Sequence, residues 1–233
     1  MIHWLVQSTD VHPDLVQGVP PEGLLGPDES AHFATLRTDK RRQEWLLGRW
    51  TAKQLLRGVV QEQTGAELAP AAVQILNGYT RAPMIRCQVP GFTSSCWSLS
   101  ISHSNRHAFC AVVDRSAWPL GADMEQVESR GADFVADYFT PAEQALVAQA
   151  PAELYDILVT AIWSAKEAAL KALQLGLTVD TRSLTCQIEL PQTMPTDWTP
   201  FYIQWNGHLD NPSTPELSGW WRPLQNFVLT LVA

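Results

Sequence analysis

The sequence predicts an α+β fold, in which helices and antiparallel strands are grouped in blocks. Two observations predict it. Apolar segments of strand length stand at both ends of two successive stretches of the chain, and longer segments with helical periodicity lie between them. The chain has 233 residues, of which 45% are hydrophobic. This length suits one large domain or two domains of about 115 residues.

The first half is expected to begin with a strand at residues 2–7, followed by a Pro- and Gly-rich loop at residues 13–27. A long helix is predicted at residues 30–63, where Trp and Leu side chains supply an apolar face. The segment 65–70 breaks that helix. Further strands are predicted at residues 73–75, 97–102 and 108–113, and a loop at residues 103–106 joins the last two.

The boundary between the halves is expected in the segment 114–119, which gives predicted domains 1–116 and 117–233. The strand at residues 120–125 opens the second half. A helix is expected to begin at Thr140, a good N-cap, because Pro141 suits the first helical position and Glu143 completes a capping box.

A second helix is predicted at residues 152–175, and Gly176 is expected to end it. Antiparallel strands follow at residues 183–190, 201–205 and 226–232. Each half therefore contains a strand, then helices, then strands. No residue-level repeat between the halves is visible in the sequence.

The formal net charge of −8 argues against general nucleic-acid binding, which requires a basic surface. The first residues have neither a basic start nor a long apolar stretch, so no signal peptide is expected. No segment approaches the roughly 18 consecutive apolar residues that a membrane span requires. We expect a cytoplasmic protein that binds neither membrane nor nucleic acid.

Three carboxylates give the strongest indication of chemistry in the sequence, because they suit a divalent cation. Asp123 and Glu125 lie two residues apart on a predicted strand and therefore point to the same side. Glu167 and Lys171 lie one turn apart on a predicted helix. Converging carboxylates would repel one another without a cation, and Mg²⁺ prefers oxygen ligands and phosphate. Each motif alone also suits a solvated surface with salt bridges.

Together the two motifs resemble those of the 4′-phosphopantetheinyl transferase superfamily. Residues 121–125 match Gly-x-Asp-x-Glu, and residues 163–171 match Trp-x-x-Lys-Glu-x-x-x-Lys. The similarity is to the two-half type that activates surfactin synthetase, and it is most specific over residues 98–171. It implies two similar α/β halves related by a pseudo-twofold, with the active site between them.

The resemblance implies transfer of the 4′-phosphopantetheine group of coenzyme A to a serine of an apo acyl or peptidyl carrier protein. Adenosine 3′,5′-bisphosphate would be released. Asp123, Glu125 and Glu167 would hold Mg²⁺, with Mn²⁺ as an alternative, and Lys166 and Lys171 would contact coenzyme A. Proteins of this type and length are typically single chains, so a monomer is expected. Fatty acid, polyketide and nonribosomal peptide carriers all stay open.

Glu143 has two interpretations. As the third residue of a capping box it needs no other function, and a Gln in its place would then leave stability nearly unchanged. The resemblance implies instead that Glu143 is a candidate general base for the attacking serine, because residues 139–143 match a Phe-x-x-x-Glu segment.

Basic residues of the first half are candidates for coenzyme A binding. Arg42 and Arg49 belong to a cationic stripe on the predicted helix, which also suits a solvated surface. The resemblance implies that Arg49 binds the 3′-phosphate, and that Ser102 and His103 belong to a phosphate-binding Ser-His-Ser motif. Arg81 is a further candidate, although its spacing departs from the Gly-Lys-Pro or Gly-Arg-Pro element that the family commonly has.

Two other classes of function stay open. One is another Mg²⁺-dependent nucleotide phosphotransferase or a pyrophosphate-cleaving enzyme that uses the same carboxylates. The other is a non-catalytic module that binds a carrier protein or coenzyme A. The sequence contains no Walker A motif and no Gly-x-Gly-x-x-Gly element, which disfavours kinases and dinucleotide-binding enzymes.

Overall fold

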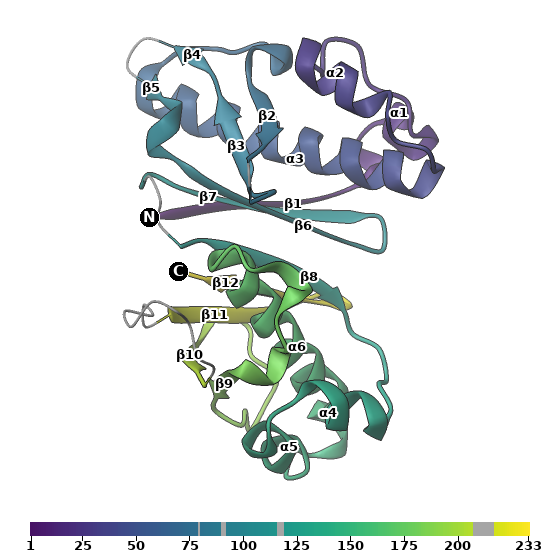
Figure 1. Ribbon diagram of the computed structural model, residues 1–233, viewed down its shortest axis with the longest axis vertical. Helices are drawn as coiled ribbons and strands as arrows, with labels where there is room; N and C mark the ends of the chain where they lie inside the picture. The colour runs from purple at the N-terminus through teal and green to yellow at the C-terminus, as the bar shows by residue number, and fades with distance from the viewer. Residues whose placement is uncertain (79, 90–91, 116–118, 207–216) are drawn as a thin grey trace. The chain divides into compact units, whose positions relative to one another are not determined.

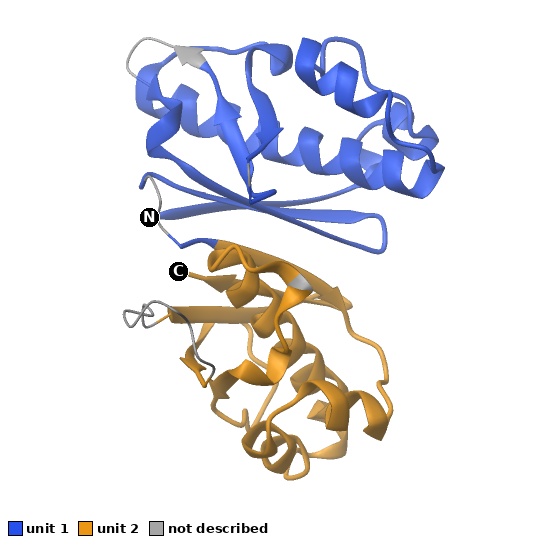
Figure 2. Cartoon of the chain, in the orientation of Figure 1, with its two compact units in different colours: residues 1–120 blue, residues 121–233 orange. Residues whose placement is uncertain are grey.

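The computed structural model describes residues 1–78, 80–89, 92–115, 119–206 and 217–233 (Figure 1). The chain divides into two compact units, unit 1 at residues 1–120 and unit 2 at residues 121–233, and each is described by itself (Figure 2). The predicted domain boundary between residues 116 and 117 lies outside the described residues.

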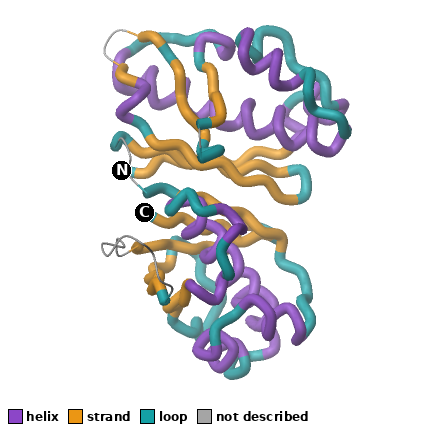
Figure 3. Tube along the Cα trace, in the orientation of Figure 1, coloured by secondary structure: helices purple, strands orange, loops and turns teal. Residues whose placement is uncertain are grey.

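Unit 1 contains a three-stranded antiparallel sheet with the order β1-β7-β6, the hairpin β2-β3 and the short pair β4-β5. The long helix α3 packs on β7 and β1 (Figure 3). The elements are β1 (Ile2–Ser8), α1 (Pro13–Gln17), α2 (Pro27–Phe33), α3 (Asp39–Thr64), β2 (Gln74–Asn77), β3 (Pro83–Arg86), β4 (Gln88–Val89), β5 (Phe92–Thr93), β6 (Ser98–Ser104) and β7 (His107–Val113).

The predicted helix at residues 30–63 is wrong at its start, because two helices occupy this region. The first, α2, ends at Phe33. The second, α3, has its own N-cap, Thr38, whose hydroxyl oxygen accepts a hydrogen bond from the Arg41 N–H. At its C-terminal end Gly65 has φ 71°, the left-handed conformation that commonly ends a helix. Local capping at Thr38 therefore divides one apolar pattern into two elements.

The predicted loops of unit 1 are wrong in two places. Residues 13–27 contain α1, which begins at Pro13 and ends at Gly18 with φ 68°. The loop predicted at residues 103–106 is shorter, because the first two of these residues continue β6. Only Asn105 and Arg106 form the turn, and both have positive φ, as a tight hairpin requires.

Unit 2 is a five-stranded antiparallel sheet with the order β8-β12-β11-β10-β9, on which the long helix α6 packs against β8 and β12 (Figure 3). Its elements are β8 (Gly121–Gln126), α4 (Ala132–Tyr138), α5 (Pro141–Val147), α6 (Ala152–Ala172), β9 (Leu184–Ile188), β10 (Thr199–Trp205), β11 (Leu217–Leu224) and β12 (Phe227–Val232). The predicted α+β fold class is confirmed.

The capping box at the start of α5 is as predicted, because Thr140 and Glu143 each accept a hydrogen bond from the other residue's N–H. The predicted end of α6 is wrong. The helix ends at Ala172, since Gln174 already has φ 57°, so Gly176 is not its C-cap. Strand β11 was not predicted. It contains Gly219, where a Cβ would lie 2.2 Å from the Phe201 ring, so here glycine makes room for a core aromatic.

The two units share one order of strands. In each, the first strand pairs antiparallel with the last, which pairs with the strand before it: β1-β7-β6 in unit 1 and β8-β12-β11 in unit 2. In each, the long helix follows the first strand along the chain and packs on it. The shared order exists although no repeat was visible in the sequence. Among the described helices, none is both long and apolar enough to cross a bilayer.

Candidate active site

Unit 2 brings together the three predicted carboxylates. Asp123 and Glu125 project from the same face of β8, and Glu167 projects from α6. One oxygen of each lies within 4.8 Å of the other two, and Asp123 is buried while the two glutamates are partly buried. This spacing allows all three oxygens to contact one small cation.

Gly121 explains how α6 comes so close to β8. A Cβ at this position would lie 1.7 Å from the carbonyl oxygen of Ala168, which real atoms cannot do. Gly121 shares its strand face with Asp123, so the same close approach brings the helix to the carboxylates. The glycine that begins the first motif therefore has a packing function.

Asp123 is held from both sides. Its Oδ1 accepts a hydrogen bond from Lys171 Nζ at 2.6 Å, and its Oδ2 accepts one from Ser164 Oγ at 2.7 Å. The hydroxyls of Ser164 and Thr230 lie 2.8 Å apart, and Thr230 is the cross-strand neighbour of Asp123. Sequence reasoning missed both hydroxyls. Ser164 could have been found, because it lies about two helical turns before Lys171 and on the same face.

Arg130 was also missed, because it lies in a loop with no motif around it. Its guanidinium donates to Glu125 Oε2 at 3.1 Å and lies 3.5 Å from Glu128. It stacks 4.5 Å from the centroid of the Phe134 ring and 5.9 Å from that of Trp163. The two aromatic rings thus hold the Arg130 guanidinium beside the carboxylate cluster.

Burial raises the pKa of Glu125 to about 7, with the Asp123 charge as the second cause and Arg130 and Lys171 acting in the opposite direction. Burial likewise raises the pKa of Glu167 to about 7, and the Asp123 charge adds to it. The nearby cations therefore do not fully compensate the clustered negative charge. The all-oxygen donor set and this surplus of negative charge fit a hard divalent cation such as Mg²⁺.

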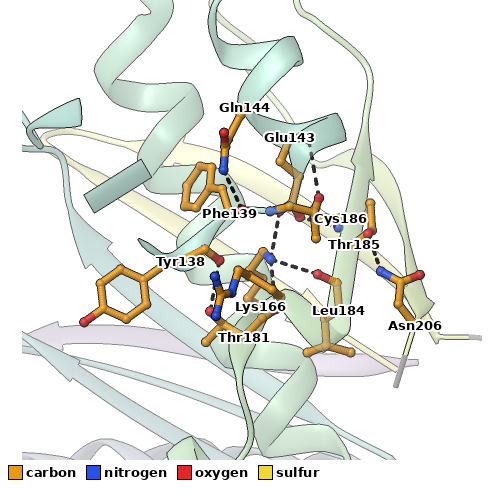
Figure 4. Close-up of polar contacts among 12 residues, drawn as sticks. Tyr138, Phe139, Glu143, Gln144, Lys166, Thr181, Leu184, Thr185, Cys186 and Asn206 are labelled. Carbon is orange, nitrogen blue, oxygen red and sulfur yellow. Dashed lines mark hydrogen bonds and ion pairs between the residues drawn. The ribbon is translucent and has the colours of Figure 1, made fainter. Parts of the chain in front are cut away.

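Glu143 and Lys166 form a buried ion pair, with 2.8 Å between Glu143 Oε2 and Lys166 Nζ (Figure 4). The ammonium also donates to the carbonyl oxygens of Thr181 and Leu184 at 2.9 and 2.8 Å. Lys166 is 0% exposed and its three donors have three acceptors. This burial argues against the predicted contact of Lys166 with coenzyme A, and we correct its function to one within the fold.

The Glu143 carboxylate is equally enclosed, at 1% exposure. Its Oε2 accepts from the Thr140 N–H at 2.7 Å, and its Oε1 accepts from the Cys186 N–H at 2.7 Å. All these partners are donors, which favours the capping interpretation over the general base. A Gln here would direct its amide N–H groups at one of the donors, so the expected indifference of stability to this substitution is also corrected.

In unit 1, Arg49 lies on α3 and is 6% exposed. Its guanidinium stacks 4.7 Å from the centroid of the Trp45 ring, lies 3.9 Å from Glu29 and donates to Asn77 Oδ1 at 3.4 Å. Burial lowers its pKa to about 10, so the group stays cationic at neutral pH. Its Nε has no hydrogen-bond partner within the described residues.

His103 lies in β6 against the same helix, because a Cβ at Gly48 would be 2.3 Å from its Nε2. The glycine before Arg49 thus allows the imidazole to approach α3. Ser102, the neighbouring residue of β6, is buried, and Arg42 stacks 4.8 Å from the Phe33 ring centroid. Arg81 is exposed in the β2-β3 connection with φ 66°.

Residues 119–225 match the sequence model of the 4′-phosphopantetheinyl transferase superfamily, which confirms the predicted resemblance over this segment. The segment contains the three carboxylates, Lys166 and Lys171. No curated protein sequence matches the chain.

Many solved structures are similar in fold, and three of them illustrate the similarity. A holo-(acyl-carrier-protein) synthase of Bacillus anthracis in complex with coenzyme A has 20% identity and a TM-score of 0.39, covering 49% of this chain and 95% of that chain. The Thermotoga maritima holo-[acyl-carrier-protein] synthase has 19% identity and a TM-score of 0.38, covering 60% and 74%. The Helicobacter pylori holo-[acyl-carrier-protein] synthase in complex with coenzyme A has 21% identity and a TM-score of 0.36, covering 48% and 98%.

Proposed function

Because residues 119–225 match the 4′-phosphopantetheinyl transferase superfamily, we propose that this chain transfers the 4′-phosphopantetheine group of coenzyme A to a serine of an apo carrier protein. The observation that carries the proposal is the convergence of Asp123, Glu125 and Glu167 within that segment. Lys171 forms an ion pair with Asp123 beside them. We further propose that the protein is of the two-half type, cytoplasmic and active as a single chain.

In the reaction the serine hydroxyl loses its proton to solvent, and its oxygen forms a bond to the β-phosphorus of coenzyme A. The bond from that phosphorus to the bridging oxygen breaks, and adenosine 3′,5′-bisphosphate leaves. Lys171 is partly exposed and lies beside the carboxylates, so its ammonium can stabilise negative charge on the leaving phosphate. Ser164 and Thr230 keep Asp123 oriented for this purpose.

Asp123, Glu125 and Glu167 would hold Mg²⁺, or Mn²⁺ in its place. When bound, such an ion supplies charge neutralisation and orientation of the pyrophosphate. The chain's own residues supply the remaining binding. Arg49, stacked on Trp45, is suited to a phosphate because a guanidinium can donate two parallel hydrogen bonds to it. Arg42, Arg81, Ser102 and His103 are the other proposed contacts to the nucleotide.

An alternative within enzymes is a different Mg²⁺-dependent phosphotransferase or pyrophosphate-cleaving enzyme, because the carboxylates would serve either equally well. A non-catalytic module that binds carrier protein or coenzyme A is less well supported. Such a module would not need to retain Asp123, Glu125, Glu167 and Lys171 together. Several carrier classes, from fatty acid, polyketide or nonribosomal peptide synthesis, remain candidate partners.

The test is to incubate the protein with coenzyme A, Mg²⁺ and several apo carrier proteins, and to measure carrier masses. The proposal expects one carrier to gain the mass of a phosphopantetheine group. Asp123→Ala is the matched negative control and should abolish the gain, since it removes a metal ligand and the anchor of Lys171. Hydrolysis of coenzyme A or another nucleotide without any change in carrier mass would favour the alternative enzyme.

A further inference from the structure

The buried pair Glu143–Lys166 joins three elements of unit 2. Glu143 lies at the third position of α5, Lys166 lies in the middle of α6, and Cys186, whose N–H the carboxylate accepts, lies in β9 (Figure 4). Lys166 also holds the backbone just before and at the start of β9, through Thr181 and Leu184. The pair therefore fixes α6 along its axis and about it.

Unit 1 contains a corresponding buried pair, Glu29 and Lys53. Glu29 lies at the third position of α2 and Lys53 in the middle of α3, with 2.6 Å between Oε2 and Nζ, and both side chains are buried. The Glu29 carboxylate accepts from the N–H of the N-cap residue Gly26 and from the N–H of Ile75 in β2. Lys53 donates in addition to the carbonyl oxygen of Leu24.

The contacts reveal a repeat that was not recognised from the sequence. Gly26-Pro27-Asp28-Glu29 in unit 1 corresponds to Thr140-Pro141-Ala142-Glu143 in unit 2, and Trp50-Thr51-Ala52-Lys53-Gln54 corresponds to Trp163-Ser164-Ala165-Lys166-Glu167. Each Glu is the third residue of a short helix that begins with a proline, and each Lys lies three residues after a Trp. The spacing from Glu to Lys differs by one residue, 24 against 23.

The units differ at the next position. Gln54 follows Lys53, whereas the carboxylate Glu167 follows Lys166. In the described residues, the only group of acidic, His or Cys side chains arranged to hold a metal is the one in unit 2. A buried Glu–Lys pair thus supports α3 in unit 1 and α6 in unit 2, and of these two helices only α6 carries a residue of the candidate metal group.

We propose that Glu143 and Lys166 are positioning residues that hold α6 where Glu167 faces Asp123 and Glu125. Glu29 and Lys53 hold α3 in the corresponding way in unit 1, whose described residues contain no candidate metal site. This inference rests on the proposed function of the carboxylate site. Glu167 directly follows Lys166, about 100° further around the helix. Any rotation or shift of α6 that breaks the pair therefore also moves the Glu167 carboxylate. Ser164 and Lys171 lie on the face of α6 that carries Glu167 and bind Asp123, so the buried pair holds the helix from the opposite face.

The test uses the full chain and compares matched double variants. Glu143→Gln with Lys166→Met removes both charges in unit 2, so no buried charge is left unpaired. Glu29→Gln with Lys53→Met makes the corresponding change in unit 1, where Glu29 also lies 3.9 Å from Arg49, a proposed nucleotide contact. The two double variants are therefore compared by their Mn²⁺ binding without coenzyme A. Mn²⁺ binding is measured with and without coenzyme A from the electron paramagnetic resonance signal of free Mn²⁺, and thermal melting is measured for each protein.

We expect the unit 2 variant to bind Mn²⁺ at least tenfold more weakly than the wild-type protein. The unit 1 variant should melt earlier but bind Mn²⁺ within twofold of the wild-type protein. Unchanged binding in the unit 2 variant would overturn the inference, as would equal weakening in both variants. If one double variant does not fold, Glu143→Asp and Glu29→Asp replace the double variants in the same comparison, since each keeps the buried charges and only withdraws the carboxylate from its lysine by one methylene group. A wild-type protein that binds no Mn²⁺ under either condition would instead overturn the proposed metal site.

Discussion

At the scale of single residues, the carboxylate cluster is an arrangement that the protein alone does not neutralise. The Asp123 carboxylate accepts hydrogen bonds from Lys171 and Ser164. Burial of the cluster, and in second place the Asp123 charge, raise the pKa values of Glu125 and Glu167 to about 7. Proton and divalent cation therefore compete for the same oxygens near neutral pH.

This competition predicts a pH-dependent response to Mg²⁺. Between pH 4.5 and about 7 the folded protein keeps protons on Glu125 and Glu167 that the unfolded chain has released, so the stability of the metal-free protein falls as pH rises. Mg²⁺ should raise the melting temperature more at pH 8 than at pH 6. Thermal melting at both pH values, with and without a saturating concentration of Mg²⁺, measures this difference. Glu167→Gln is the control and should reduce it, whereas an equal response at both pH values would contradict the prediction.

Arg49 provides the second prediction at this scale. If its guanidinium binds the 3′-phosphate, Arg49→Ala should raise the KM for coenzyme A about ten- to a hundredfold, since a charge-assisted hydrogen bond is worth roughly 1.5–3 kcal/mol. The matched control is dephospho-coenzyme A, which lacks that phosphate and also corrects for any loss of stability from the buried position. Steady-state kinetics measure the KM of the wild-type protein and the variant for both substrates. An equal rise of the KM for coenzyme A and for dephospho-coenzyme A would place Arg49 outside the 3′-phosphate site.

At the scale of elements, the approach of α6 to β8 assembles the site. Strand alternation puts Gly121, Asp123 and Glu125 on one face, and the helix crosses that face with no side chain between Gly121 and the carbonyl oxygen of Ala168. A methyl group at position 121 would push α6 away from β8 and so move Glu167 and Lys171 away from Asp123.

Gly121→Ala should therefore lower the free energy of unfolding by about 1–3 kcal/mol or more, because its Cβ would overlap backbone that cannot move aside cheaply. Chemical denaturation measures the change, and Mn²⁺ binding should weaken together with it. Gly58→Ala on α3 is the matched control. Nothing lies within 4 Å of a Cβ there, so alanine should stabilise that helix by about 0.5–1 kcal/mol. Wild-type stability of the Gly121 variant would refute the packing argument.

At the scale of the whole molecule, the candidate functions are divided between the units. All three carboxylates, Lys171, Arg130 and the positioning pair belong to unit 2, which has its own apolar core. The proposed nucleotide contacts belong to unit 1.

A fragment of residues 119–233 is accordingly expected to fold cooperatively and to bind Mn²⁺ within about tenfold of the full chain. It should transfer no phosphopantetheine, because it lacks Arg49 and His103. Circular dichroism melting, Mn²⁺ titration and carrier mass measurement test the three parts, with the full chain as the control. Transfer by the fragment at the rate of the full chain would refute a function for unit 1 in the reaction.

The sequence by itself determined what depends on local periodicity and on short-range capping. Alternation along residues 121–125 placed two carboxylates on one side, the helical repeat placed Glu167 one turn from Lys171, and Thr140 with Glu143 marked the start of α5. These properties hold whatever the chain packs against, so the fold class and the carboxylate cluster could be predicted.

Only the tertiary structure decided what depends on residues far apart in the chain. The burial of Lys166 results from its contacts with Glu143, Thr181 and Leu184. Asp123 is supported by Ser164, which lies 41 residues away along the chain, and by Thr230 on the neighbouring strand. No local pattern records the partners of Lys166 or the contact of Ser164 with Thr230, although helical spacing does place Ser164 on the face of Lys171. A lysine beside a glutamate on a helix reads the same in sequence whether it faces water, a phosphate or a buried carboxylate, and the surrounding packing alone decides which of these it meets.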